Sequence, residues 1–512
     1  MILFFCFLQI GRYQAYINIY KMNTDLTQCI EEKMDLFKKY LDRSNMEHKD
    51  YQYEGVKWCL TNELRADPPC GVRGGFIADE MGLGKTIMMI GTFVTNLVKR
   101  TLVIVPPVLI DQWYIQIFKT TGHRALIYHG DNKKTITLDQ LNNALIVIST
   151  YGAITLTKKQ LDTASITMLH RVAWSRIVFD EAHHLRNSKT TRYISAKMLS
   201  SRIRWLVSGT PVQNKKKDFY NLCSMLKLPA SYYTVSENLR QLATSFILKR
   251  TKKQVGIQMP DVITDKNIVN WTNRKEMELS EEIHSALAFS RVSDKKSDKL
   301  AVSSVKGKGM LALILRARQT CILPKLMSSS LNQLKVEGKL IDFSSYKEAF
   351  NHSSKLDSVI ATILERKDNG CGKLIFCHFR EEIDEIASRL RAGGMTKVVT
   401  FDGRTTNAKR FDVLNDKNEA LILQIQTGCE GLNLQENYSE IYFISPHWNP
   451  AVEDQAVARC HRIGQTKPVF VKRFEMCNFM QDEDQEIDTR TIDNYVAGVQ
   501  DSKRVIAKEC IE

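Results

Sequence analysis

The chain has 512 residues, of which 43% are hydrophobic, 9% aromatic and 25% charged. This composition excludes fibrous, collagen-like and wholly disordered proteins, and at about 150 residues per domain the length predicts two large or three smaller domains. The 72 lysines and arginines exceed the 57 acidic residues by 15, which favours a polyanionic partner, although a surplus serving solubility gives the same balance. The 12 cysteines include no C-x-x-C pair, so a zinc ribbon or RING insertion is not expected.

The N-terminal region comes before the first motif. Residues 1–47 are expected to form an extension, and residues 1–21 are interpreted as an upstream extension of the reading frame because Met22 opens a more ordinary polar start. The longest apolar run, Met1 to Leu8, is too short to cross a bilayer, so no membrane segment is expected.

Short β-branched runs alternate with helical stretches in two parts of the chain, residues 48–228 and 351–475. This alternation predicts two α/β domains with parallel sheets. Residues 229–350 carry few strand signals and are predicted to form a helical insertion and linker, and residues 476–512 a C-terminal tail. The predicted strands are 102–105, 144–148, 176–179 and 204–207 in the first domain, and 373–376, 397–401, 420–423 and 441–444 in the second.

Residues 74–86 contain an apolar strand, a glycine-rich loop and the start of a helix. Glycines in such a loop allow backbone N–H groups to surround phosphate oxygens, and the helix N-terminus adds positive potential. Lys85 is expected to reach the β- and γ-phosphates of a nucleotide, and Thr86 to ligate Mg²⁺. Asp79 stands where the strict phosphate-loop pattern has glycine. The predicted nucleotide-binding loop is Asp79, Glu80, Met81, Gly82, Leu83, Gly84, Lys85 and Thr86.

A buried strand ends in two adjacent carboxylates within Asp180-Glu-Ala-His183. Asp180 is expected to hold the magnesium shell, and Glu181 to orient and deprotonate the attacking water, because phosphoryl transfer depends mainly on positioning and charge stabilisation. A solvated acidic turn is the alternative. Further along, Ser208 and Thr210 end another strand and could sense the phosphate state.

The second α/β domain supplies two arginines on a predicted helix. Arg459 and Arg462 stand three residues apart, which puts both guanidinium groups on one helix face. Planar, permanently charged donors suit the negative charge that develops on a transferred phosphoryl group. A salt-bridge face is the alternative interpretation.

These blocks, in this order, resemble the Swi/Snf-type ATPases of helicase superfamily two, from about residue 48 to 475. The resemblance implies two RecA-like parallel-sheet domains in tandem, separated by a helical insertion, that close over ATP. It also implies that Gln52 reads the adenine edge and that Arg462, with Arg459 beside it, acts as an arginine finger. The matching motifs begin at Gln52, Asp79, Asp180 (the DEAH box), Ser208, Phe401, Gly431, His447 and Gln455.

By this resemblance the chain is expected to be a DNA-stimulated ATPase that uses ATP and Mg²⁺. It would translocate on double-stranded DNA without separating the strands and remodel or displace bound proteins, such as nucleosomes or transcription machinery. The expected location is the nucleus, and the host nucleus if the chain is viral. The DNA track is expected to cross residues 106–109 with Gln112 and Trp113, and residues 149–151.

Two stretches and two rival functions stay open at the level of sequence. The basic cluster Lys249–Lys253 fits a DNA grip, a nuclear-import signal or a solvated face, and Cys429 and Glu430 replace the small neutral residues of relatives. An RNA or single-strand DNA helicase would share the ATP site. A non-catalytic transcriptional regulator is the other alternative, against which the intact ATP-site residues argue.

Overall fold

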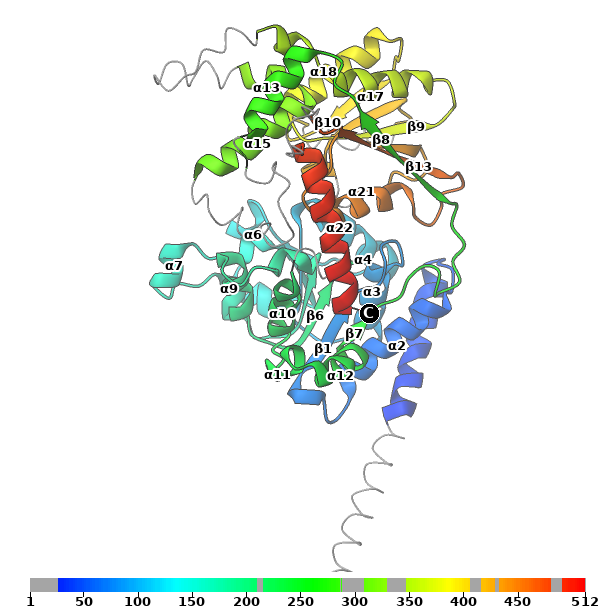
Figure 1. The fold of residues 1–512 in the computed structure, drawn as a ribbon. Helices are drawn as coiled ribbons and strands as arrows, with labels where there is room; N and C mark the ends of the chain where they lie inside the picture. The colour runs from blue at the N-terminus through cyan, green and yellow to red at the C-terminus, as the bar shows by residue number, and fades with distance from the viewer. Residues whose placement is uncertain are drawn as a thin grey trace, which may run out of the picture. The chain divides into compact units, whose positions relative to one another are not determined.

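The computed structural model describes residues 26–209, 215–285, 287, 308–328, 347–405, 416–428, 432–479 and 490–511. The chain divides into two compact units, Met1–Gln258 with Ile506–Glu512, and Met259–Val505. Each unit contains one parallel sheet with helices around it (Figure 1), which confirms the predicted α/β class with two parallel-sheet domains in tandem. The interpretation of residues 1–21 lies outside the described residues. None of the helices among the described residues has the length and apolar content needed to cross a membrane.

The first unit is built on a seven-stranded sheet in the order β3-β4-β2-β5-β6-β1-β7, and its paired strands are parallel. Its central strands are continuous apolar runs, as expected for strands covered on both faces. The four strands predicted for this part of the chain are all present. The strands are β1 (Arg73–Ile77), β2 (Thr101–Val105), β3 (Leu126–Tyr128), β4 (Ile146–Thr150), β5 (Trp174–Asp180), β6 (Ser201–Val207) and β7 (Ile247–Leu248).

Successive residues of a strand point to opposite faces, so each face of this sheet has its own apolar core. Val103 and Val105 of β2 belong to the core on the α2, α3 and α4 face, and Leu102 and Ile104 to the core on the α9, α10 and α12 face. The helices of this unit are α2 (Asp50–Leu64), α3 (Lys85–Thr95), α4 (Ile110–Thr121), α5 (Leu138–Asn143), α6 (Tyr151–Ile154), α7 (Lys158–Asp162), α8 (Met168–Arg171), α9 (Thr191–Met198), α10 (Lys216–Met225), α11 (Ser231–Thr234) and α12 (Ser236–Phe246).

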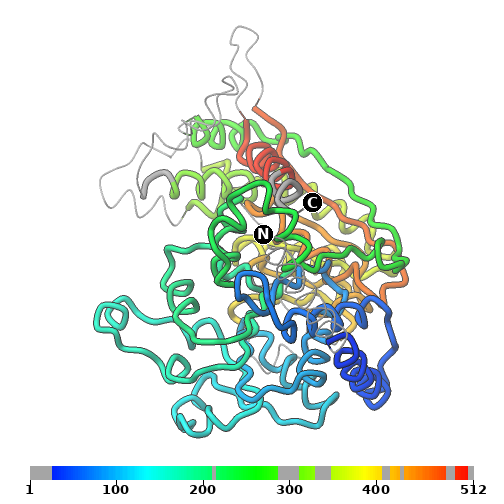
Figure 2. The backbone as a smooth tube through the Cα atoms, turned by 90° about the horizontal axis from the view of Figure 1, so that it is seen from below, coloured from blue at the N-terminus to red at the C-terminus, as the bar shows by residue number. Residues whose placement is uncertain are grey.

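A helix over residues 26–43, dark blue in Figure 2, packs into the core of the first unit. Its buried side chains include Phe37, which touches α3 at Gly91: a Cβ at Gly91 would lie 2.5 Å from the Phe37 ring. Residues 26–43 therefore belong to the first unit, although the sequence predicted an extension over residues 1–47 that precedes it. Their apolar periodicity is the signal that could have revealed this contact.

We expect Phe37→Ala to lower the free energy of unfolding by about 3–5 kcal/mol, because it leaves a cavity beneath α3. Phe37 is 0% exposed, whereas its neighbour Leu36 is 44% exposed. Leu36→Ala is therefore a matched control that should change stability by less than about 0.5 kcal/mol. Urea unfolding of both variants tests this, and equal losses would show that the helix does not belong to this core.

The second unit has a six-stranded sheet in the order β10-β11-β9-β12-β13-β8, again with parallel pairs. The edge strand β8 lies inside residues 229–350, for which helices were predicted. Its residues are mostly exposed, so the sequence shows no apolar pattern that would predict a strand. The strand is formed by parallel pairing with β13. The strands are β8 (Val262–Val269), β9 (Gly372–Cys377), β10 (Val398–Phe401), β11 (Ala420–Gln424), β12 (Tyr438–Phe443) and β13 (Val469–Met476).

Helices cover both faces of the second sheet as well. Leu356 of α17 and Ile386 of α18 pack on one face, and Ala456 of α21 packs on the other. The predicted C-terminal tail contains α22, whose Ile492 and Val496 complete the first of these cores. The helices are α13 (Arg274–Ser285), α15 (Lys308–Ile322), α17 (Ser354–Glu365), α18 (Arg380–Ala392), α20 (Ile425–Gly428), α21 (Pro450–Cys460) and α22 (Ile492–Ile511).

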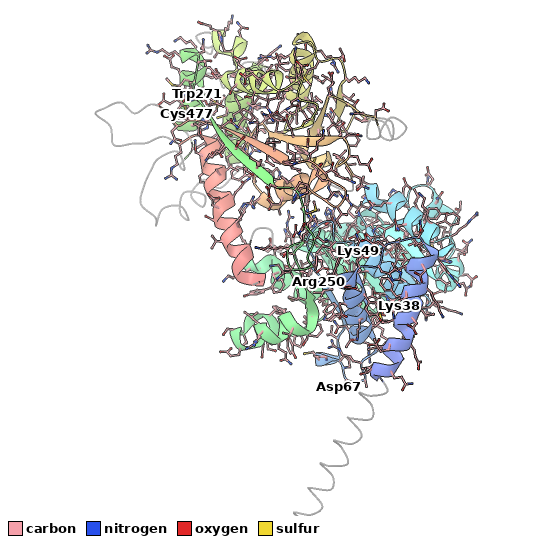
Figure 3. The ribbon with its side chains drawn as sticks, turned by 90° about the vertical axis from the view of Figure 1, so that its right-hand side faces the viewer. Lys38, Lys49, Asp67, Arg250, Trp271 and Cys477 are labelled. Atoms are coloured by element: carbon pink, nitrogen blue, oxygen red, sulfur yellow. The ribbon has the colours of Figure 1, made fainter. Side chains whose placement is uncertain are left out.

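Polar groups are also buried between the helices of the second unit. At the carboxyl ends of β8 and β13, near the labelled Trp271 and Cys477 of Figure 3, the Cys477 amide donates to the Val269 carbonyl at 2.9 Å. Beside this pair His284 is fully buried, and its Nε2 accepts from the Ile492 amide at 2.9 Å. Its Nδ1 therefore carries the proton and donates to a carbonyl oxygen of the preceding helical turn, so the imidazole is held neutral.

Burial lowers the pKa of His284 to about 4, from an ordinary value of 6.5. The unfolded chain therefore binds a proton at His284 more tightly than the folded chain does. The contribution of the neutral His284 to the free energy of unfolding is complete above pH 6.5 and is lost as the pH falls towards 4. We expect a loss of about 3 kcal/mol across this window, which His284→Gln should remove. Urea unfolding at a series of pH values measures it.

Candidate functional site

The loop between β1 and α3 has the backbone conformation of an anion-binding loop. Gly82 and Gly84 have φ of 92° and 76°, in the left-handed region that side chains other than glycine rarely adopt. Gly84 is the N-cap of α3, so the N–H groups of the first helical turn point out of the helix end. This local geometry gives the oxygen atoms of a phosphate both hydrogen-bond donors and a positive helix end.

Lys85 is the first residue of α3, and its ammonium group is held over this loop. The Nζ atom donates to the carbonyl oxygens of Asp79 at 2.8 Å and Glu80 at 3.2 Å. Gln52 of α2 lies on the other side of the loop, buried, with its Nε2 3.4 Å from the Leu83 carbonyl. The structure therefore brings Gln52 to the loop over residues 79–86, as the predicted site requires.

Asp180 ends β5 at the carboxyl edge of the sheet and is nearly buried, with 8% exposure. Burial and the charge of Glu181 raise the pKa of Asp180 to about 7. The Trp113 indole, which donates to Oδ2 at 2.7 Å, and the positive charge of Lys85 oppose this rise. The carboxylate is thus close enough to Lys85 to feel its charge, and it is oriented by an indole that lies 67 residues earlier in the chain.

Glu181 turns out of the strand immediately after Asp180. Its φ of 49° is left-handed, and its amide donates to Oδ1 of Asp180 at 3.0 Å. Its carboxylate is 3.3 Å from Nδ1 of His183, which also lies 3.3 Å from the Ser208 hydroxyl. Ser208 follows β6, which lies between β5 and β1, so the strand end predicted to sense phosphate adjoins both carboxylates and the loop. Thr210 lies outside the described residues.

Three residues assigned to the DNA track are buried instead. Trp113 is 1% exposed and supports Asp180, and the Tyr151 hydroxyl donates to the Asp180 carbonyl at 2.6 Å. Ser149 is 0% exposed and donates to the Tyr128 carbonyl at 2.8 Å. These side-chain assignments were wrong because residue type and place in the sequence do not reveal which way a side chain points. Gln112 is exposed and stays available.

The two arginines predicted to share a helix face do not do so. Helix α21 ends at Cys460, and Gly464 with φ of 100° turns the chain, so Arg459 lies on the helix and Arg462 follows it. Arg462 donates to the Asn433 side chain. Burial and the charge of Arg459 lower the pKa of Arg462, which places the two guanidinium groups within electrostatic reach. Cys429 and Glu430 lie outside the described residues.

The residues of the first unit fit a magnesium ion that is shared with a nucleotide. In phosphate sites Mg²⁺ takes one or two oxygen ligands from the protein and the rest from phosphates and water. Asp180 is a carboxylate whose orientation is fixed by Trp113 and the Glu181 amide, and Thr86 offers a hydroxyl in the first turn of α3. The donor set therefore suits an ion held jointly with phosphate.

Two family models match the chain over these same elements. The SNF2-related domain matches residues 51–236, and the helicase conserved C-terminal domain matches residues 354–464. The chain belongs to the SNF2-related family. This SNF2-related chain is a helicase-like, ATP-dependent enzyme, which confirms the predicted resemblance. The first domain model covers the loop with Lys85 and the Asp180–Glu181 pair, and the second covers Arg459 and Arg462.

Individual relatives agree with this family. Within it we predict a likeness to the baculovirus global transactivators. The probable global transactivator of Orgyia pseudotsugata multicapsid polyhedrosis virus is 27% identical and aligns with 90% of this chain and 91% of its own length, which confirms that likeness. An uncharacterized ATP-dependent helicase of Mycoplasma genitalium is 27% identical over 95% of this chain, and the bovine DNA excision repair protein ERCC-6-like is 26% identical over 85%. The chain spans only 45% and 40% of those two proteins.

Among solved structures, the Sulfolobus solfataricus SWI2/SNF2 ATPase core in complex with dsDNA aligns with 84% of this SNF2-related chain and 88% of its own chain. The identity is 25% and the TM-score is 0.37.

Proposed function

We propose that this chain is a DNA-stimulated ATPase that moves along double-stranded DNA and displaces or remodels proteins bound to it, in the control of transcription or chromatin in the nucleus. One observation carries the ATPase part of this proposal. The phosphate-binding loop after β1 and the Asp180–Glu181 pair after β5 lie at the same edge of one sheet, on either side of the end of β6. Carboxyl ends of parallel strands are where α/β proteins bind ligands.

In this proposal each residue has a separate role. Lys85 binds the β- and γ-phosphates, and Gln52 contacts the adenine. Thr86 and Asp180 would hold Mg²⁺, which would neutralise phosphate charge. Glu181 orients the attacking water and accepts its proton, and Arg462 with Arg459 stabilises the charge that develops on the transferred phosphoryl group.

The choice of DNA rests on the relatives and on charge. Bovine ERCC-6-like and the Arabidopsis thaliana RAD5B protein are named as DNA repair proteins. The net charge of +15 suits a polyanion, whose phosphates attract lysines and arginines whatever the base sequence. Nucleosomes or transcription machinery are the protein targets that we propose, and the name of the viral transactivator supports a role in transcription.

The test compares ATP hydrolysis by the purified chain without nucleic acid, with duplex DNA, with single-stranded DNA and with RNA. We expect duplex DNA to stimulate most. Lys85→Ala should lose both nucleotide binding and hydrolysis, whereas Lys133→Ala, at an exposed loop lysine, should lose neither. Stronger stimulation by RNA would favour an RNA helicase. No hydrolysis in any arm would favour a non-catalytic regulator.

Movement along DNA needs its own measurement. A translocase that does not separate strands should release a third strand from a DNA triplex in an ATP-dependent way and leave a forked duplex paired. Release of the third strand without ATP, or unwinding of the fork, would contradict this part of the proposal.

A further inference from the structure

The basic cluster Lys249–Lys253 does not form one exposed face. The side chain of Arg250 is 17% exposed and that of Lys252 is 6% exposed, whereas Lys249 and Lys253 are exposed. Two of its four basic side chains are therefore turned into the first unit. Only Lys249 and Lys253 could contact a polyanion. Neither DNA binding nor a nuclear-import signal therefore explains the whole cluster.

Arg250 forms a two-pronged ion pair with the first residue of the phosphate-binding loop. Its Nε lies 3.1 Å from Oδ1 of Asp79, and its Nη2 lies 2.6 Å from Oδ2. Its Nη1 donates to the Tyr51 carbonyl at 2.5 Å, so the guanidinium joins the loop to the start of α2, where Lys49 and Arg250 are labelled in Figure 3. Charge-assisted pairs of this geometry fix orientation as well as distance.

Packing keeps this guanidinium in place. The Asp79 side chain is 0% exposed, so Arg250 is the partner that compensates for burying its carboxylate. A Cβ at Gly55 of α2 would lie 3.0 Å from Nη2 of Arg250 and 2.5 Å from Sδ of Met88. A glycine at this position leaves room for the guanidinium between two helices.

The next residue of the loop is held in the same way. The Lys252 amide donates to Oε2 of Glu80 at 2.8 Å, and its ammonium lies 3.2 Å from Oε1. The Glu80 amide donates to the Arg250 carbonyl at 2.9 Å, and the Ala78 amide donates to the Leu248 carbonyl at 2.8 Å. Side chains and backbone of residues 248–252 thus hold the entry to the loop.

Asp79 and Glu80, which these contacts hold in place, in turn hold Lys85. The Lys85 ammonium donates to the carbonyl oxygens of Asp79 and Glu80. We propose that Arg250 is a positioning residue for ATP: with Lys252 it fixes Asp79 and Glu80, and their carbonyls set where the Lys85 ammonium meets the phosphates. This explains an acidic residue at position 79, since glycine offers no partner for Arg250. The proposal rests on the ATP site of the proposed function.

The contacts of Arg250 and Lys252 also connect the phosphate-binding loop to the segment that leads out of the first unit. Residues 249–252 lie shortly before Gln258, the last residue of the first unit before the chain enters the second unit. The segment that leaves the first unit is therefore tied to the phosphate-binding loop.

The test measures the affinity for a fluorescent ATP analogue, kcat and KM for ATP, and the melting temperature. We expect Arg250→Gln to lower kcat/KM by about 10²-fold, because a misplaced Lys85 loses its contact with phosphate. Arg250→Lys, which keeps the charge but not the two-pronged geometry, should lose less. Lys133→Gln makes the same charge change at an exposed side chain outside the cluster and should match the native chain.

A second variant separates positioning from stability. Breaking the pair leaves the Asp79 charge buried and lowers the melting temperature, whereas Asp79→Ala/Arg250→Met removes both charges and should recover most of that loss. We expect the weak ATP binding to persist in this double variant. Recovery of affinity together with stability would reduce Arg250 to a structural role and overturn the proposal. If the native chain itself binds no ATP, the proposed function fails. If Arg250→Gln binds ATP as tightly as the native chain while Lys85→Ala does not, only the positioning role of Arg250 is refuted.

Discussion

Replacing Arg462 by alanine is expected to lower kcat for ATP hydrolysis by about 10³- to 10⁵-fold, the range in which arginine fingers act. The physical reason lies in the charges around it. Burial and the positive charge of Arg459 disfavour the charged form of Arg462 and lower its pKa, so negative charge arriving there relieves a repulsion that the protein already carries. Such an arrangement stabilises a group whose charge grows in the transition state.

The measurement is single-turnover hydrolysis at saturating duplex DNA, with nucleotide affinity determined separately. Arg274→Ala is the matched control, because its side chain is 86% exposed and forms an ion pair with Glu278 one helical turn away. Arg462→Lys keeps the charge without the planar fork and should recover part of the rate. A kcat within tenfold of native in Arg462→Ala would show that this arginine is not the finger.

Glu181→Gln is expected to lower kcat by about 10²- to 10⁴-fold and to leave ATP binding intact, because an amide keeps the shape of the side chain and cannot accept the proton. The carboxylate is well placed for this role. It follows Asp180 in a left-handed turn, is 15% exposed and lies 3.3 Å from the His183 ring.

The two effects are separated by measuring equilibrium binding of the ATP analogue alongside turnover. Glu54→Gln, at an exposed position on α2, is the control for removing one carboxylate from the same unit. If ATP binding fell in parallel with turnover, Glu181 would contribute to binding ATP in the ground state, as a metal or phosphate contact. It would then not be the group that accepts the proton.

Local features of the chain were predictable because their causes are local. Apolar runs of four or five residues predicted the core strands, and their alternation with helical stretches predicted two α/β units. Gly82 and Gly84 predicted the loop, since a left-handed backbone is a property of the residue itself. The segment over residues 26–43 could have been found by its helical periodicity, whereas β8, most of whose residues are exposed, carries no such signal.

The partners of buried polar groups were not predictable. Trp113 and Asp180 are 67 residues apart, Glu63 and the buried Arg176 113 apart, and Asp79 and Arg250 171 apart.

The amino-acid sequence alone therefore determined the class, the family and the candidate residues for binding and hydrolysing a nucleotide. Only the tertiary structure decided which side chains support them: that Trp113 orients Asp180 instead of touching DNA, that Arg462 lies beyond the end of its helix, and that Arg250 turns inward. The reason is that hydropathy fixes which residues are buried, whereas a buried charge is paired by whatever the packing of distant elements brings beside it.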